Sequence, residues 1–134
     1  MTRPPEAALV DASVWCAAAN RDERWHEESV ALLHGAGAVF ALDLTLYEVA
    51  NVAVRSWRAP YAVPDLLELI SGTCAAPLAI ITPRRARQAA QVADEHTISV
   101  YDAAYVTVAA ELGCTLVSCD VRDLVSKGLA ILPG

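Results

Sequence analysis

Four acidic residues of this 134-residue chain fall where predicted strands end or predicted helices begin: Asp11, Glu48, Asp102 and Asp120. Asp11 and Asp120 come directly after apolar runs that have the length of strands. Glu48 and Asp102 fall in the first turns of helical patterns. In a right-handed parallel α/β sheet, strand ends and helix starts gather along one edge, where ligands bind. We therefore expect the four carboxylates to lie close together.

Carboxylates held close together repel one another unless a cation shares them. Sites built from carboxylate oxygens select hard ions, so Mg²⁺ or Mn²⁺ is the predicted cofactor. The hydroxyls of Ser13 and Ser118 are near enough in sequence to hydrogen-bond a carboxylate or a bound water, although turn hydrogen bonding explains them equally well. Asn51 shares a helix face with Glu48 and is either a supporting residue or part of a solvated face. Asp123 is either a fifth, outer ligand or a first-turn acid.

Helix capping is the alternative explanation for each acid taken singly. The pairs Thr45 with Glu48 and Ser99 with Asp102 both have capping-box spacing. Asp11 and Asp120 can likewise be N-caps of the helices that follow them. The coincidence of four acids at four strand-to-helix junctions favours a metal site.

The elements that must position these acids alternate between short apolar runs and longer helical patterns, which is typical of an α/β fold with a parallel sheet. The predicted strands are Ala7 to Val10, Ala38 to Leu42, Leu78 to Ile81, Thr115 to Cys119 and Leu129 to Leu132. The predicted helices are Leu46 to Trp57, Pro64 to Ile70, Arg84 to His96 and Asp102 to Leu112, with an interrupted helix from Ser13 to Leu33. Gly72 and Gly113 are the predicted left-handed helix ends.

The composition fits one domain over residues 1–134 with a large apolar core, since 55% of the residues are hydrophobic. A net charge of -6 argues against a broad basic surface for nucleic acid, but clustered carboxylates contribute to it. The Cys and His residues lack zinc-site spacing. With no signal peptide or membrane-spanning run, we expect a cytoplasmic protein. One short predicted helix carries four large apolar residues, Leu66, Leu67, Leu69 and Ile70. These are more than a single buried stripe of a helix can hold, which predicts a homodimer.

With the four acids in this order, the chain resembles the PIN-domain ribonucleases and, among them, the VapC-type toxins of bacterial toxin-antitoxin systems. The segments that carry the resemblance are LVDAS at 9–13, LYEVAN at 46–51, SVYDAAY at 99–105 and LVSCD at 116–120. The third segment is the most specific. Ser118 stands where a threonine is more usual, and this departure keeps a hydroxyl.

The resemblance implies a three-layer α/β/α sandwich whose central, mostly parallel sheet has four or five strands. It implies Mg²⁺- or Mn²⁺-dependent endonucleolytic cleavage of RNA, a homodimer and inhibition by a cognate antitoxin. Asp11, Glu48, Asp102 and Asp120 would form the acidic site, with Ser13, Asn51 and Ser118 in supporting positions.

Two other functions compete with this one. A PIN-like binding module would keep the acids as helix caps and cleave nothing. A phosphotransfer or receiver-type domain also has acids at strand ends, but Asp11 is followed by Ala12 and Ser13 rather than by a second acid at two residues' distance, and Lys127 is poorly placed for a receiver.

Overall fold

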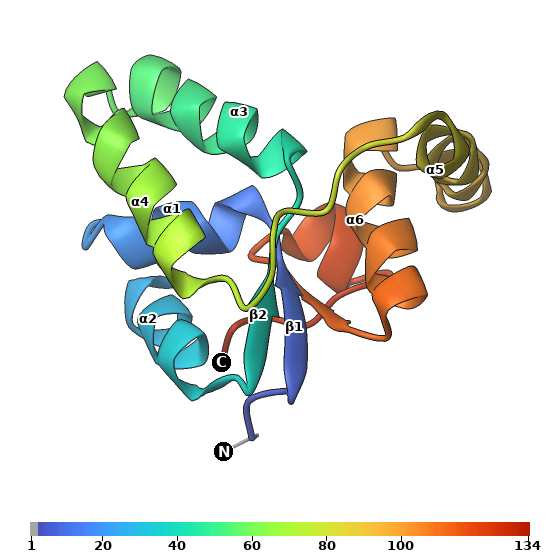
Figure 1. Ribbon diagram of the computed structural model, residues 1–134, viewed down its shortest axis with the longest axis horizontal. Coiled ribbons are helices and arrows are strands. Elements are labelled where there is room, and N and C mark those ends of the chain that lie inside the picture. Colours follow the sequence, from blue (N-terminus) through green and yellow to red (C-terminus); the bar gives the residue numbers. More distant parts are fainter. Residues whose placement is uncertain (1–2) are drawn as a thin grey trace.

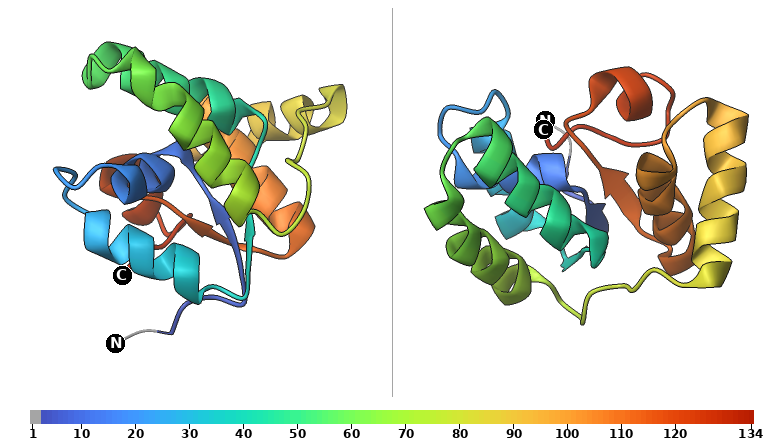
Figure 2. Two further views of the ribbon diagram at one scale, coloured as in Figure 1. Left: turned by 60° about the vertical axis from the view of Figure 1, so that its left-hand side comes forward. Right: turned by 90° about the horizontal axis from the view of Figure 1, so that it is seen from above.

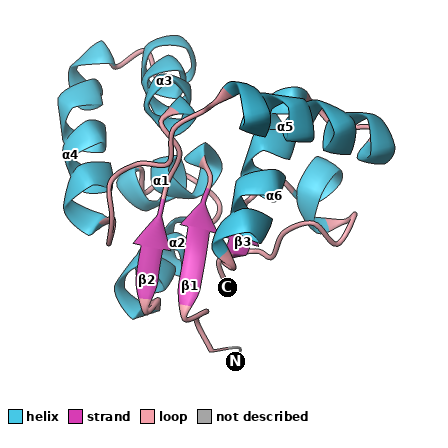
Figure 3. Cartoon of the chain, turned by 45° about the vertical axis from the view of Figure 1, so that its right-hand side comes forward, coloured by secondary structure: helices cyan, strands magenta, loops and turns pink. Residues whose placement is uncertain are grey.

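The computed structural model describes residues 3–134 and has a parallel sheet at its centre. Strand β1 (Ala7–Val10) lies between β2 (Ala38–Phe40) and β3 (Thr115–Val117), as Figure 1 shows for β1 and β2. Both neighbours run parallel to β1, with Leu9 opposite Phe40 on one side and Leu116 on the other. All three strands therefore end at the same edge of the sheet, as Figure 3 shows for β1 and β2.

The predicted fourth strand, Leu78 to Ile81, is reduced to one parallel bridge between Ala79 and Leu42. Ala79 donates to the carbonyl of Ala41 and accepts from the N–H of Asp43. The ladder stops there because the next donor, the N–H of Ile81, bonds the carboxylate of Asp43 instead of a backbone carbonyl. Parallel pairing is therefore present within the predicted range, but the predicted length of the strand was wrong.

The predicted fifth strand, Leu129 to Leu132, is likewise a single bridge, between Ile131 and Val117. Ile131 donates to Leu116 and accepts from Ser118. The next residue able to continue this ladder is Pro133, which has no N–H to donate. Two bridges thus extend a three-stranded sheet where four or five strands were expected.

Within the described residues, six α-helices surround the sheet: α1 (Ala12–Ala19), α2 (His26–Gly35), α3 (Leu44–Asn51), α4 (Val63–Thr73), α5 (Pro83–His96) and α6 (Val100–Leu112). Short π-helical or 3₁₀ turns follow α3 and β3 and precede α4: η1 (Val52–Ser56), η2 (Pro60–Ala62) and η3 (Val121–Val125). Figures 1 and 2 show α1 to α4 on one side of the sheet and α5 and α6 on the other. The arrangement is the predicted three-layer α/β/α sandwich.

Alternation along β1 explains the layers, since successive strand residues point to opposite faces. Ala8 and Val10 pack into the core cluster formed with α1 to α4, and Leu9 packs into the cluster formed with α6 and η3. Helix α5 lies outside this second layer, where Ala89 and Ala93 pack against Ala103 of α6. Small side chains at this contact let the two helices approach closely.

Helix ends agree with the sequence in one case and differ in another. Gly113 ends α6 with a left-handed φ of 68°, as predicted. Gly72 does not end α4, because the helix continues to Thr73 and the extended residue Cys74 follows it. Thr97, a non-glycine residue, takes the left-handed conformation that ends α5.

The apolar side chains of α4 are buried to different extents. Leu66 and Ile70 are buried in the core, whereas Leu67 and Leu69 pack against the same core and stay partly exposed. The homodimer expected from this helix stays a prediction. Within residues 3–134, no helix has both the length and the apolar content needed to cross a bilayer.

Candidate metal centre

Asp11 lies at the carboxyl end of β1 and is the N-cap of α1. Its N–H continues the β1–β3 ladder by donating to the carbonyl of Val117, and its carboxylate accepts from the N–H of Ser13 at 3.1 Å. The Ser13 hydroxyl donates to the same oxygen at 2.5 Å. The residue is only 6% exposed. Asp11 therefore serves as a cap, as the capping alternative required, in a position where a carboxylate is almost completely removed from water.

The two supporting serines connect the ends of β1 and β3. Ser13 accepts from the N–H of Cys119 at 2.9 Å while donating to Asp11. Ser118, fully buried, accepts from the N–H of Asp120 at 2.9 Å. The hydroxyls thus fix the backbone from which Asp120 projects, so that both strand-end acids belong to one hydrogen-bonded unit.

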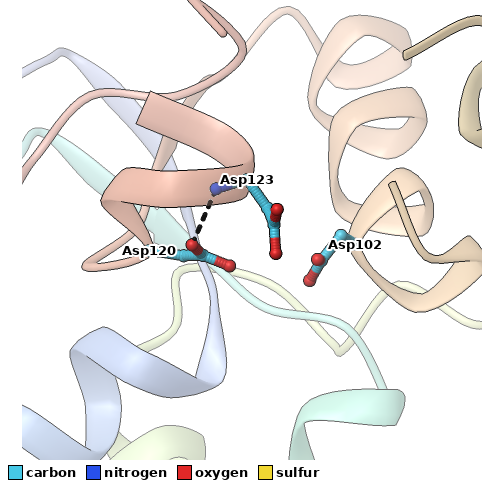
Figure 4. A group of neighbouring side chains, drawn as sticks. All are labelled: Asp102, Asp120 and Asp123. Carbon is cyan, nitrogen blue, oxygen red and sulfur yellow. Dashed lines mark hydrogen bonds between the residues drawn. The ribbon is translucent and has the colours of Figure 1, made fainter. Parts of the chain in front are cut away.

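Asp120, Asp123 and Asp102 converge in front of this unit. Figure 4 shows Asp102 on α6 pointing toward the two acids of the η3 region. One carboxylate oxygen from each residue lies within 4.8 Å of the other two. Asp120 is also the N-cap of η3, accepting from the N–H of Asp123 at 3.0 Å. The structure therefore adds Asp123 to the group formed by Asp102 and Asp120.

The loop between α5 and α6 sets the position of Asp102. The left-handed Thr97 reverses the chain, and Ser99 then becomes the N-cap of α6 by accepting from the N–H of Asp102 at 3.0 Å. Half of the predicted capping box is present here. Because the backbone N–H of Asp102 makes this bond, its side chain stays available to the site.

Glu48 differs from its prediction in position and partner. The N-cap of α3 is Asp43, so Glu48 lies in the second helical turn rather than the first. The hydroxyl of Thr45 does not form a capping box with it and bonds the Tyr105 hydroxyl at 2.7 Å. Glu48 Oε1 accepts a hydrogen bond from that same Tyr105 hydroxyl at 2.5 Å.

The sequence reading missed Tyr105 as a partner of this site. The residue stands three positions after Asp102 on a predicted helix, so the two side chains share a face. That spacing was a usable signal.

Electrostatic repulsion links the acids that the strands and helices bring together. Burial raises the pKa of the Asp11 carboxyl to about 6, the hydroxyls of Ser118 and Ser13 oppose this shift, and the charge of Glu48 adds to it. Burial also raises the pKa of Glu48, against the hydrogen bond from Tyr105 and with the charge of Asp102. For Asp102, burial first and then the charge of Asp120 raise the pKa.

A divalent cation fits the donor set of Asp102, Asp120 and Asp123. All the donors are carboxylate oxygens, the ligands that Mg²⁺ and Mn²⁺ prefer. Two oxygens on opposite sides of Mg²⁺, each at about 2.1 Å, would lie about 4.2 Å apart, so three oxygens within 4.8 Å of one another can share one ion. Across residues 3–134, these three carboxylates form a single ion pair, in which Asp123 lies 3.8 Å from the exposed Arg122. The negative charge is therefore largely uncompensated.

Asn51 is the predicted supporting residue that the structure leaves apart from the acids. It is exposed at the end of α3, and within the described chain its side chain makes no hydrogen bond to any of them. Its exposure agrees with a solvated polar face, and a supporting role for Asn51 stays a prediction.

Comparison with known proteins identifies the family. The PIN domain profile matches residues 8–126 of the chain. The chain belongs to the PIN-domain family. The match covers β1 through η3 and therefore all of the acids described above. No curated protein sequence matches the chain significantly.

Solved structures of PIN-type proteins have the same fold. PAE2754 from Pyrobaculum aerophilum is 27% identical, with a TM-score of 0.70 over 95% of this chain and 83% of that one. VapC20 of Mycobacterium tuberculosis, a sarcin-ricin loop cleaving toxin, is 19% identical, with a TM-score of 0.71 over 86% of this chain and 91% of that one. VapBC2 from Rickettsia felis, bound to a DNA fragment from its promoter, is 13% identical, with a TM-score of 0.66 over 94% and 96%. For the last two, the likeness concerns the fold alone.

Proposed function

We propose that this PIN-domain protein is a Mg²⁺- or Mn²⁺-dependent endoribonuclease and the toxin of a type II toxin-antitoxin pair. The observation that carries the proposal is the convergence of Asp102, Asp120 and Asp123 with almost no compensating positive charge. A group of helix caps has no need for such convergence, whereas a cation site does.

Asp102, Asp120 and Asp123 would hold the cation, with Asp11 as a ligand or as the anchor behind them. When bound, a divalent cation neutralises charge on the phosphoryl oxygens and lowers the pKa of water. Glu48 would take up the proton of the attacking water or act as a further ligand, and its raised pKa suits a base. A side-chain nucleophile is not required.

RNA cleavage with Mg²⁺, Mn²⁺ or EDTA tests the proposal directly. We expect cleavage with either cation and none in EDTA, and we expect Asp11→Asn and Asp102→Asn to abolish it with the fold retained. Asp65→Asn is the matched control, because Asp65 is an exposed first-turn acid on α4. Wild-type cleavage by either folded site variant would contradict the assignment, and cleavage by none of the proteins would favour a binding module.

An antitoxin partner is part of the same proposal, since VapBC2 and the toxin-antitoxin complex from Klebsiella pneumoniae share this fold. A cluster of carboxylates attracts a cationic side chain as it attracts a metal, so the inhibiting segment would place an Arg or Lys at the acids. An inhibitory complex in which that segment lies far from Asp11 and Asp102 would count against this idea. The proposed homodimer is tested separately, by light scattering at micromolar concentration.

A further inference from the structure

Tyr105 lies between the core and the acids. Its ring is packed with Leu9, Leu42 and Val108 in the cluster beneath α6, and the residue is only 1% exposed. Its hydroxyl, however, extends from that core toward α3, where it meets Thr45 and Glu48. One side chain therefore joins the helix that carries Asp102 to the helix that carries Glu48.

The direction of these hydrogen bonds follows from proton counting. A phenol has one proton, and Tyr105 donates it to Oε1 of Glu48, which as a carboxylate oxygen can only accept. The bond between Tyr105 and Thr45 must then run the other way, with the Thr45 hydroxyl donating to the phenol oxygen. Thr45 is itself fully buried. The order is Thr45 to Tyr105 to Glu48.

This arrangement does more than burial of a tyrosine requires. A buried hydroxyl needs one partner, and Thr45 alone would supply it. The second bond instead binds a half-buried glutamate whose long side chain would otherwise occupy several rotamers. A charge-assisted bond restricts that freedom strongly. Within the chain as described, Oε2 of Glu48 has no hydrogen-bond partner.

We propose that Tyr105 is a positioning residue, whose hydroxyl holds Oε1 of Glu48 so that the carboxylate keeps one orientation and Oε2 stays available to the cation or to water. This inference rests on the proposed function. It predicts that removal of the buried Tyr105 hydroxyl lowers the affinity of the site for the cation, although this hydroxyl makes no contact with RNA.

Tyr105→Phe removes the hydroxyl and keeps the packed ring. We expect Mn²⁺ binding, measured by calorimetry, to weaken about 10- to 100-fold, the usual effect of losing a group that orients a ligand. The kcat of RNA cleavage should fall in the same range while KM for RNA is unchanged, because a hydroxyl buried with Tyr105 cannot reach the substrate. Tyr101→Phe is the matched control, the same change one turn earlier on α6 at a residue 65% exposed.

A double-mutant cycle with Glu48→Ala separates positioning from a general structural role. If Tyr105 acts through Glu48, Tyr105→Phe costs Mn²⁺ affinity in the wild-type background and almost none in the Glu48→Ala background. Equal losses in both backgrounds, or wild-type affinity and kcat in Tyr105→Phe, would overturn the proposal. If Tyr105→Phe fails to fold, Thr45→Val tests the same chain of bonds, and about a twofold to tenfold loss is expected.

The Mn²⁺ measurement also keeps the two proposals distinguishable. Wild-type protein that binds Mn²⁺ but cleaves no RNA would reject the proposed nuclease, while the binding cycle would still decide the role of Tyr105. Wild-type protein that binds no Mn²⁺ would reject both.

Discussion

The acidic site has a closed half and an open half. In the closed half, Asp11 is buried, caps α1 and receives two hydrogen bonds from Ser13, which is tied in turn to Cys119. In the open half, Asp102 and Asp123 are partly exposed and their carboxylates are free of comparable hydrogen bonds within residues 3–134. The first carboxylate is fixed by the fold, whereas the other two can adjust.

This difference teaches that the capping and metal-site explanations are not exclusive. Asp11, Asp120 and the Ser99 turn all cap helices, and the caps are what aim the carboxylates and backbone of the site. A cap satisfies only part of a carboxylate, because each oxygen has two lone pairs. In the closed half, the hydrogen bonds that stabilise the fold use an oxygen of Asp11 that a metal would also need. In the open half, the carboxylates of Asp102 and Asp123 are free to bind a metal without loss of such bonds.

Ser13→Ala should produce the largest change in stability. Its loss leaves the N–H of Cys119 without its partner and removes a donor from Asp11, so we expect the free energy of unfolding to fall by about 1–3 kcal/mol. Urea denaturation of the metal-free protein measures this. Ser126→Ala, which removes an exposed hydroxyl bonded to the Arg122 carbonyl, should cost less than about 0.5 kcal/mol. Equal costs would remove the distinction between the two halves.

The pH dependence of stability should be next in size. Because the pKa of Asp11 is about 6 in the folded protein and 3.8 for an aspartate in an unfolded chain, the folded state binds more protons between these values. Stability is therefore lost as pH rises from about 4 to 6 and stays constant above. Lowering the pH of metal-free protein from about 7.5 to 5 should raise the free energy of unfolding by about 1–2 kcal/mol.

Asp11→Asn is the control for this pH effect, since asparagine keeps the cap and cannot ionise. The variant should lose most of the pH dependence, leaving the smaller contributions of Glu48 and Asp102, whose pKa values are raised in the same direction. An unchanged pH profile in the variant would show that Asp11 is not the group responsible. Mn²⁺ affinity of the wild type should fall below pH 6, because protons compete for the same oxygens.

Asp102→Asn should have the smallest effect. Asn keeps the helix turn, and removal of one charge relieves repulsion with Asp120, so metal-free protein should gain about 0.5 kcal/mol. Mn²⁺ should stabilise the wild type more than the variant by preferential binding to the folded state. Thermal melts in EDTA and in excess Mn²⁺ measure both. If wild type and Asp102→Asn have equal melting points in EDTA and are stabilised equally by Mn²⁺, helix capping is the only explanation left for these acids.

The sequence was sufficient to predict the layers of the fold, because the apolar runs and helical periods are long-range signals carried by many residues. The lengths of the outer strands were not predictable, since they depend on single events: the carboxylate of Asp43 takes the N–H of Ile81, and Pro133 lacks a donor. Local capping chemistry thus overrode the apolar pattern.

Placement of the acids was predictable only to the sheet edge. Strand ends and helix starts located Asp11, Asp102 and Asp120, but the choice of Asp123 as the third member of the close group depends on the turn of η3. Glu48 was assigned to the wrong helical turn because Thr45 matched a capping pattern that Asp43 in fact provides. Two candidate caps two residues apart cannot be ranked without the tertiary contact to Tyr105.

The pairing of β1 with β3 has a consequence for synthesis of the protein. Strand β1 can pair with β2 early but receives its second neighbour, β3, only when residues 115–117 emerge, and Asp120 and Asp123 follow later still. A chain on the ribosome grows from its N-terminus. Every nascent chain that reaches Asp11 and ends before Asp120 therefore contains Asp11 but neither Asp120 nor Asp123. The nuclease proposed here would therefore lack its complete acidic centre until residues 120–123 have left the ribosome.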